Sequence, residues 1–415
     1  MTEVIVGLDI GTSFVRAVIG EITEEKELLI VGIGSAPSTG LRNGQIVNIE
    51  STMQSIKAAI EEAEFKAGTT VLSCITSIGG SQIESLLSKG SVGITTKSGG
   101  NREVNSDDIA RVIDSAKALN IPLDRQILHV VSRNYSVDDQ HEIKDPKNIL
   151  GFRLEVEVCI ITASKTAASN IAQCINRADY GYDLMFLKTL AAAEATISEE
   201  EKDLGSILID LGGGTTDVLV FSEGRPLHAL SLPIGGKVVT DDISIMRGIS
   251  IESAERIKKN SGCCWYSLVS EDEEVIIPGV GGNSPQIIPR MELCKIIQPR
   301  LEEIFALIRK KLPAYVKNVR LSGSVVLSGG GALMPGIVEL AIKEFQTNNV
   351  KIAQPANYGG AVELYRNPEY ATVIGLLVAN LDRGQKNTAD KPIKTKKNKN
   401  NKFTEIVGGI FKEFF

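Results

Sequence analysis

The chain has few of the residues that build metal centres. Its three histidines are scattered, and its six cysteines show no Cys-X-X-Cys spacing. These patterns exclude the common zinc sites and favour reduced thiols in a cytosolic protein. No apolar run approaches the roughly 20 residues that span a bilayer, and the first residues lack the pattern of a secretion signal. We therefore expect a soluble protein without a transmembrane segment.

Length and charge set the next limits. The 415 residues are 43% hydrophobic and carry a net charge of −6, which suits a globular chain long enough for two domains. The charge is uneven, because residues 383–402 contain seven Lys and one Arg against one Asp, a net charge of +7 that leaves −13 for the remainder. This segment has no apolar periodicity, so we expect a disordered basic linker there.

Two segments share one pattern. Residues 4–20 and 206–221 each read as an apolar strand, an aspartate at its end, a turn rich in Gly, Thr and Ser, and a second strand, with Asp9 and Asp210 at equivalent points. The turn residues are Gly11, Thr12 and Ser13 in the first copy, and Gly212, Gly213, Gly214, Thr215 and Thr216 in the second. The repetition predicts a duplicated fold that holds one ligand between its halves. The alternative is two unrelated hairpins.

The chemistry of these turns indicates a phosphate-bearing ligand. Glycine lets the backbone approach closely, and successive backbone N–H groups form a concavity that binds anions. A carboxylate beside such a turn repels phosphate but can hold hydrated Mg²⁺, which prefers carboxylates together with phosphates. We therefore expect a di- or triphosphate with Mg²⁺, and Asp9 and Asp210 as the metal ligands. The same two aspartates are our candidates for any catalytic role.

A third glycine-rich turn follows the apolar run at 325–327. Residues 328–336 predict a strand end, a turn and then a helix that begins after Pro335. Gly329, Gly330 and Gly331 would let the backbone lie flat against a base or a ribose. Such turns are common, and this one is informative because it follows the other two in order.

The order of these motifs resembles that of the actin-like ATPase superfamily. That pattern is a phosphate turn, a connecting helix, a second phosphate turn, an adenosine turn and a second connecting helix, here at 9–14, 187–197, 210–217, 327–336 and 370–381. The resemblance implies an α/β fold of two lobes, each with a central mixed sheet flanked by helices, that bind ATP and Mg²⁺ between them. Small residues in both connecting segments would let the two helices cross closely.

The last thirteen residues, 403–415, have apolar side chains at the spacing of one helical face. These are Phe403, Ile406, Val407, Ile410, Phe411, Phe414 and Phe415. At 1.5 Å per residue such a helix is about 20 Å long, too short to cross a bilayer. A membrane interface, a partner's groove and the chain's own core are the candidate apolar media. The basic linker favours an anionic membrane surface.

Three features together resemble the FtsA family of bacterial cell division proteins. They are an insertion after residues 71–80, the run at 233–243 that follows the second phosphate turn, and the amphipathic terminal segment. The resemblance implies a subdomain relocated relative to actin, and filaments on the cytoplasmic face of the cell membrane at the division site. The implied partners are the C-terminal peptide of the tubulin-like FtsZ, further copies of the chain, the anionic membrane and other division proteins, and no nucleic acid.

The same resemblance divides the chain into parts. Residues 1–80 and 158–200 form lobe one with its connecting helix, 81–157 the inserted subdomain, 201–236 and 319–382 lobe two with the second connecting helix, 237–318 the subdomain that covers adenosine and binds FtsZ, 383–402 the linker, and 403–415 the membrane helix. It also implies that Gly236, Glu255 and Lys258 lie at the nucleotide, although Glu255 and Lys258 could be a solvated pair. Arg300 serves either the partner interface or the subdomain fold.

One departure from the superfamily concerns hydrolysis. Many of its ATPases carry Glu-Pro in the first connecting helix, where the Glu positions the attacking water. The matching pair here is Lys188–Thr189, and Glu194 lies further along. Hydrolysis without a water-orienting carboxylate is slow, so we expect at most a weak ATPase. A pilus-assembly adaptor of related fold and a small-molecule kinase remain the alternatives, and neither needs residues 403–415.

Overall fold

The computed structural model describes residues 3–96, 99–279, 284–317 and 322–389, and side chains up to residue 381. By its internal contacts the chain forms two compact units. Unit 1 comprises Met1–Ser85, Ile121–Leu128 and Ile161–Leu377, and unit 2 comprises Leu86–Asn120, His129–Ile160 and the segment from Val378 onward. Most of the expected linker and the whole expected membrane helix lie outside the described residues.

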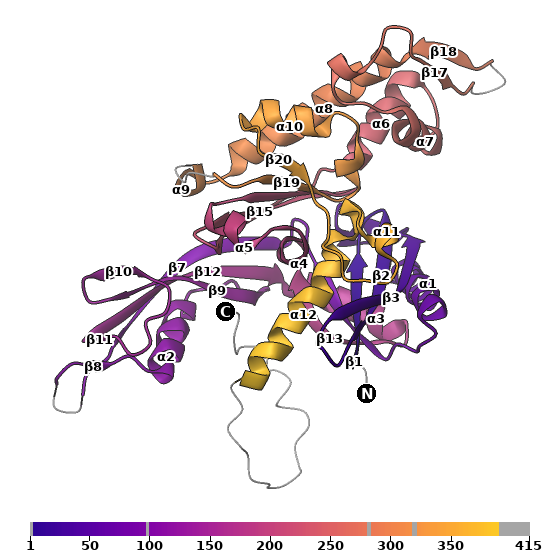
Figure 1. The fold of residues 1–415 in the computed structure, drawn as a ribbon. Coiled ribbons are helices and arrows are strands. Elements are labelled where there is room, and N and C mark those ends of the chain that lie inside the picture. The colour runs from indigo at the N-terminus through magenta and orange to yellow at the C-terminus, as the bar shows by residue number, and fades with distance from the viewer. Residues whose placement is uncertain (1–2, 97–98, 280–283, 318–321, 390–415) are drawn as a thin grey trace. The chain divides into compact units, whose positions relative to one another are not determined.

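Unit 1 contains two five-stranded mixed sheets with the same strand pattern (Figure 1). The first has the order β13-β6-β1-β2-β3 and the second the order β16-β15-β14-β19-β20. In each, one end is an antiparallel meander and the other two pairings are parallel. The strands of the first sheet are β1 (Glu3–Ile10), β2 (Phe14–Ile22), β3 (Leu28–Pro37), β6 (Ser73–Ile78) and β13 (Gly181–Leu187). Those of the second are β14 (Ile207–Leu211), β15 (Thr216–Ser222), β16 (Arg225–Leu232), β19 (Val325–Ser328) and β20 (Val350–Ile352).

The two predicted hairpins are the equivalent corners of these sheets. The Gly11 N–H donates to the Phe14 carbonyl at 3.0 Å, and the Gly212 N–H donates to the Thr215 carbonyl at 2.9 Å. A Cβ on Gly11 or Gly212 would lie 2.7 or 2.9 Å from that same carbonyl oxygen, so both tight turns require glycine. The repeated pattern therefore folds as the repeated structure that the sequence predicted.

Helices cover the first sheet. The helix α1 (Ile49–Ala67) packs on β2 and β3, and α3 (Lys165–Arg177) packs on α1 and β13. The close approach depends on Gly34, where a Cβ would lie 1.9 Å from the Ala59 carbonyl oxygen. Asn48 caps α1 by accepting the Ser51 N–H, and Gly68 ends it in the left-handed conformation.

The two connecting helices cross as closely as their small residues predicted. They are α4 (Lys188–Thr196) and α12 (Ala371–Ala389). A Cβ on Gly375 would lie 1.7 Å from the Ala191 carbonyl oxygen, which confirms the close crossing. The helix α12 continues to Ala389, so the expected disordered linker does not begin at residue 383.

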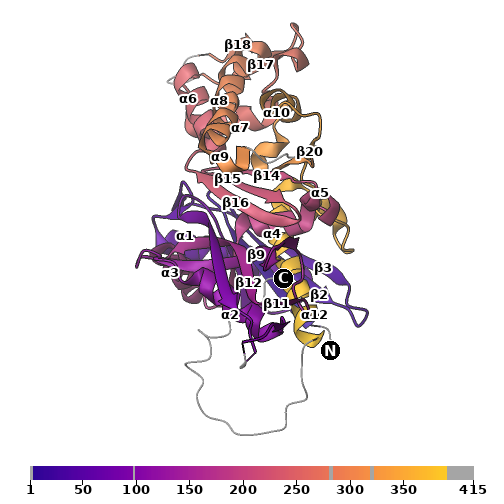
Figure 2. The same ribbon diagram turned by 90° about the vertical axis from the view of Figure 1, so that its left-hand side faces the viewer.

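A group of helices and a hairpin lies to one side of the second sheet (Figure 2), where α10 packs on β20 and α8 packs against both α6 and α10. These elements are α6 (Gly236–Arg247), α7 (Ile251–Ser261), α8 (Arg290–Lys311), α10 (Ile337–Phe345) and the hairpin of β17 (Glu274–Ile277) and β18 (Gln286–Pro289). The shorter elements are β4 (Leu41–Arg42), β5 (Gln45–Ile46), α5 (Glu199–Asp203), α9 (Ala314–Lys317), α11 (Val362–Tyr365) and the 3₁₀ turns Tyr266–Leu268, Gly330–Leu333 and Pro368–Tyr370. All six cysteines of the chain are free and buried, as expected for reduced thiols.

Unit 2 is built on the expected insertion. Its sheet has the order β10-β9-β12-β7, from β7 (Ile83–Gly93), β9 (Arg125–Val137), β10 (Gln140–Ile143) and β12 (Arg153–Ser164). A small pair joins β8 (Arg102–Glu103) to β11 (Leu150–Gly151). The helix α2 (Ser106–Lys117) starts with an Asn105 cap, which forms a capping box with Asp108.

Among the helices that the structure describes, none has the length and apolar character needed to cross a membrane.

Candidate nucleotide-binding site

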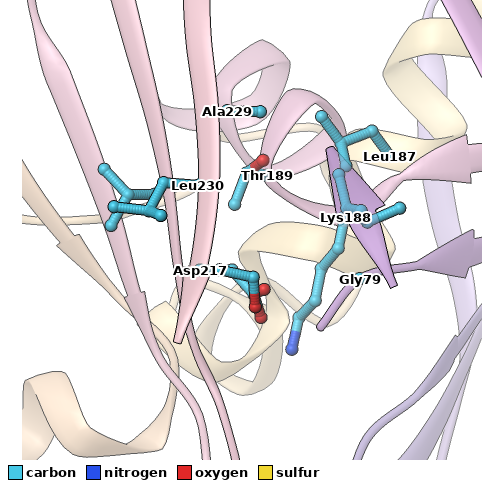
Figure 3. Close-up of a pocket in the computed structure, with 10 residues that line it drawn as sticks. Gly79, Leu187, Lys188, Thr189, Asp217, Ala229 and Leu230 are labelled. Atoms are coloured by element: carbon cyan, nitrogen blue, oxygen red, sulfur yellow. The ribbon is translucent and has the colours of Figure 1, made fainter. Parts of the chain in front are cut away.

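The carboxylates that end the equivalent strands lie around one ammonium group. Asp9 and Asp210 are 4% and 1% exposed. The Lys188 Nζ lies 3.0 Å from Asp210 Oδ2, and its charge interacts with those of Asp9 and Asp217. In Figure 3 the end of the Lys188 side chain lies beside the Asp217 carboxylate. Lys188 is the first residue of α4 and directly follows β13 of the first sheet. Its ammonium nevertheless lies beside Asp210 of the second sheet.

The three carboxylates differ in their hydrogen bonds. Asp9 accepts the Ser77 hydroxyl at 2.6 Å. Asp217 accepts the Gly80 N–H at 2.9 Å and the Thr215 hydroxyl at 2.8 Å. Asp210 Oδ2 is buried and, within the described part of the chain, has the Lys188 ion pair but no hydrogen bond. It is therefore the carboxylate with unused capacity for a ligand.

The electrostatics of this cluster reflect an excess of negative charge. Burial by itself would lower the pKa of Lys188, but Asp210, Asp9 and Asp217 raise it well above its usual value. Burial raises the pKa of Asp210, and the nearby Asp217 adds to that rise while Lys188 opposes it. Both shifts have one meaning: the site attracts positive charge. A cation that arrived with an anionic ligand would be stabilised here.

The two phosphate turns come together as predicted. A Cβ on Gly213 would lie 2.0 Å from the Ser13 hydroxyl oxygen, and one on Gly214 would lie 2.8 Å from the Thr12 hydroxyl oxygen. The Thr12 hydroxyl accepts the Gly44 N–H at 3.0 Å. The Thr216 hydroxyl is already engaged by the backbone, because it donates to the Ile234 carbonyl at 2.8 Å.

A cavity lies behind these turns. It is lined by residues that include Gly11, Thr12, Gly79, Lys188 and Asp217. A second pocket, drawn in Figure 3, shares Gly79, Lys188 and Asp217 with the first. Lys188 and Asp217 thus line both spaces.

The third glycine turn also reaches Asp210. Strands β14 and β19 are parallel, with Asp210 opposite Ser328. Gly329 has a φ of 78°, and a Cβ there would lie 2.2 Å from Asp210 Oδ1. A Cβ on Gly331 would lie 2.7 Å from the Leu211 Cβ. Only glycine fits at these positions, so the adenosine turn that the sequence predicted lies against the second phosphate hairpin.

Glu255 and Lys258 form a partly buried ion pair, in which the Lys258 side chain is the more buried member. The Lys258 ammonium lies 2.6 Å from Glu255 Oε2 and donates to the Gly236 carbonyl at 3.0 Å and the Thr240 hydroxyl at 2.8 Å. Burial lowers the pKa of Lys258, and the charge of Glu255 opposes that effect. Burial would raise the pKa of Glu255, but Lys258 holds it below its usual value. The pair fixes α7 on the first turn of α6, beside Gly236.

Arg300 is engaged within its own subdomain. Its Nε and Nη2 donate to the two oxygens of Asp242 at 2.6 and 3.0 Å, and Nη1 donates to Glu303. The first two bonds join α8 to α6. Arg300 therefore has a role in the subdomain fold, which was one of the two roles that the sequence left open.

The sequence analysis missed three residues at the carboxylates: Ser77, Gly80 and Asp217. The signal for Asp217 was its position, because it lies opposite Asp210 in the hairpin register. Ser77 and Gly80 lie at or just after the end of β6, which runs parallel to β1. Ends of parallel strands meet at one edge of a sheet, so the end of β6 was a place where partners of Asp9 could be expected.

A full protein cage for a metal is not formed by the described residues, which contain no group of three or more His, Cys, Asp or Glu side chains able to hold one. The residues do fit a metal that arrives with phosphates. Mg²⁺ needs only one or two carboxylates when phosphates and waters complete its shell, and Asp210 has a buried oxygen without a hydrogen bond. The third glycine turn packs against the other oxygen of the same carboxylate, at Gly329.

Solved structures share this architecture. The chain superposes on a structure of the PilM–PilN type IV pilus biogenesis complex with a TM-score of 0.64 at 17% identity, covering 91% of this chain and 98% of that one. It superposes on MreB5 of Spiroplasma citri bound to AMPPNP with a TM-score of 0.51 at 15% identity, covering 94% and 99%. At such identities the likeness establishes the fold alone. The protein has the actin-like ATPase fold, with the two lobes and mixed sheets that the sequence predicted.

Sequence comparison gives the family. The family model described as "Cell division protein FtsA" matches residues 207–375, and that of the "SHS2 domain inserted in FTSA" matches residues 80–162. The cell division protein FtsA of Borreliella burgdorferi is 38% identical over 414 residues, which cover 100% of this chain and 99% of that protein. The chain belongs to the FtsA family of cell division proteins, with the inserted subdomain of that family.

Proposed function

We propose that this FtsA-family chain binds ATP with Mg²⁺, polymerises on the cytoplasmic face of the cell membrane at the division site, and anchors the FtsZ ring there. The observation that carries the nucleotide part is the meeting of the two glycine turns. The turns at Gly11–Ser13 and Gly212–Thr215 face each other beside the buried Asp9 and Asp210. Backbone N–H groups of such turns bind anions, and carboxylates beside them suit a hydrated cation that arrives with phosphates.

Within this site the residues divide the work. Backbone N–H groups of the two turns bind the phosphates, and Asp9 and Asp210 hold Mg²⁺, which neutralises phosphate charge. The turn Gly329–Gly331 lies on one side of the adenosine. Gly236 and the Glu255–Lys258 pair lie on the other.

Hydrolysis in this site is slow at best. The group at the position of the superfamily's water-orienting Glu is the Lys188 ammonium, which cannot accept a proton while it is charged. Glu194 is also engaged, because its Oε2 lies 2.8 Å from the Lys202 Nζ. ATP therefore acts mainly as a switch for polymerisation.

The membrane and the FtsZ ring are the proposed partners of two further parts. Residues 403–415 have the spacing of an amphipathic helix, and the preceding basic segment adds attraction of about 1 kcal/mol for each Lys or Arg near an anionic surface. The subdomain at 237–318 would bind the FtsZ C-terminal peptide, with Arg300 at or beneath that surface. Other division proteins would join through the same filament.

Co-sedimentation with anionic liposomes tests these assignments. The full chain with ATP and Mg²⁺ should pellet with liposomes and carry FtsZ into the pellet. The variant Phe411→Asp, on the apolar face, should remain in the supernatant but still bind ATP, whereas Glu405→Gln, on the polar face, should pellet like the parent. Pelleting of Phe411→Asp at the parent level would refute the anchor. A parent chain that stays in the supernatant with FtsZ would favour the pilus-adaptor alternative, which does not need residues 403–415. Phosphate transfer to sugars would favour a kinase.

A further inference from the structure

Lys188 forms a largely buried ion pair between the two sheets of unit 1. Its backbone follows β13 of the first sheet, and its ammonium lies 3.0 Å from Asp210 at the end of β14 in the second. The stem of the side chain is held by packing, because a Cβ on Gly79 would lie 3.2 Å from Lys188 Cβ and 3.3 Å from its Cδ. The fold therefore places this charge beside Asp210 when no ligand is bound.

The surroundings of this charge are those of a cation site. Three carboxylates interact with the one ammonium, and two of them are hydrogen-bonded by protein groups. The third, Asp210, has a buried oxygen whose partner is Lys188. Removal of the ammonium would leave this carboxylate buried and unpaired beside two others, which is strongly unfavourable. A cation is needed here whether or not a ligand is bound.

We propose that the Lys188 ammonium is a built-in cation that takes the place of a divalent metal ion at Asp210 until a nucleotide brings phosphates into the site. A metal ion alone is then excluded, because it would meet the positive charge of Lys188 within a few ångströms. With phosphates in the site, Lys188 would pair with a phosphate oxygen instead, and Asp210 would be the carboxylate available to hold Mg²⁺. The second half of this proposal rests on the proposed nucleotide site, whereas the first half does not.

Metal binding without nucleotide tests the first half. Mn²⁺ would be titrated into the full chain and its free concentration followed by electron paramagnetic resonance, with melting temperatures in Mg²⁺ as a second measurement. Lys188→Gln should bind Mn²⁺ at least about tenfold more tightly than the parent, because one nearby positive charge is gone. Its melting temperature should rise with Mg²⁺, while the parent's should not.

Two variants control for the loss of a buried lysine. Lys188→Arg keeps the charge and should exclude Mn²⁺ like the parent. Lys202 is another buried lysine, paired with Glu194 and the exposed Glu199. Lys202→Gln should lower stability without creating a Mn²⁺ site. Equal Mn²⁺ affinity in Lys188→Gln and the parent would overturn the proposal, because Lys188 would then be a structural ion pair only.

A measurement on the parent chain covers the case in which Lys188→Gln does not fold. The parent should bind stoichiometric Mn²⁺ only when ATP is present, and that site should be lost in Asp210→Asn. Tight binding of Mn²⁺ to the parent without nucleotide, abolished by Asp210→Asn, would overturn the proposal without any change at Lys188. Failure of the parent to bind a fluorescent ATP analogue would instead remove the proposed nucleotide function and leave the comparison of metal binding intact.

Discussion

The crossing of α4 and α12 predicts a large effect of a single methyl group. In Gly375→Ala the new Cβ would lie 1.7 Å from the Ala191 carbonyl oxygen, where ordinary contact begins at 3.4 Å. The helices must therefore move apart by about 1.7 Å, or the backbone must bend. The obstacle is a main-chain oxygen, which cannot rotate away as a side chain would.

The magnitude follows from two opposing contributions. Overpacking of a well-packed interior costs about 1–3 kcal/mol, and the upper end applies to a clash with rigid backbone. Alanine is favoured over glycine inside a helix by about 1 kcal/mol. The net loss is then about 2 kcal/mol, which lowers the melting temperature by roughly 3 °C, because the unfolding entropy grows with the number of residues and unit 1 is large. Because α4 begins at Lys188, the displacement should also weaken binding of a fluorescent ATP analogue.

Thermal unfolding of the full chain measures this prediction, with Gly93→Ala as the matched control. Gly93 has no atom within 4 Å of an added Cβ and has no positive φ, so its replacement should change stability by less than about 0.5 kcal/mol. A Gly375→Ala chain that melts within 1 °C of the parent would show that the helices separate at little cost, and the reasoning from close crossing would fail.

Three further predictions concern charge and burial. Asp210→Asn should weaken ATP binding at least about tenfold in Mg²⁺ but leave the protein folded, since it removes a buried charge beside Asp217; equal affinity by titration would exclude Asp210 from the site. Burial raises the pKa of Cys74 and Cys159 to about 12, so the native thiols should resist Ellman's reagent at pH 7.5 and react after denaturation; rapid native reaction would contradict that burial. Hydrogen bonding from Arg102 lowers the pKa of Asp108 to about 2, so its stabilisation is present above pH 4 and is lost as the pH falls towards 2. Solvent screening reduces the stabilisation from Asp108 to about 1 kcal/mol. In acid unfolding, Asp108→Asn should therefore lose less stability between pH 4 and pH 2 than the parent does. Equal losses in the two proteins would refute the role of Asp108.

The hairpins and their turns could be predicted from the sequence because their signals are local. A strand, an aspartate and a glycine turn occur within about a dozen residues, and the same pattern occurs twice. The close crossing of α4 and α12 could also be predicted from the sequence, since it depends on small residues within two short segments. Each of these inferences needed only the chemistry of neighbouring residues.

The remaining features depend on contacts that sequence spacing does not reveal. Ser77 reaches Asp9 because β6 pairs with β1, although the two residues are 68 positions apart. Lys188 was noticed as a departure from the superfamily, but its burial against Asp210 follows from the meeting of two sheets. The end of α12 was placed too early, because residues beyond 381 have no apolar periodicity and yet continue the helix.

The twin sheets differ in one electrical respect. Opposite Asp9 stands Arg16, paired with Glu369 at 2.8 Å, whereas opposite Asp210 stands another acid, Asp217. A binding site made of two identical halves would accept an elongated ligand in either of two orientations. The opposite signs of Arg16 and Asp217 make the two corners unequal, so an elongated ligand with a metal-bound end and a neutral end would be more stable in one orientation than in the other.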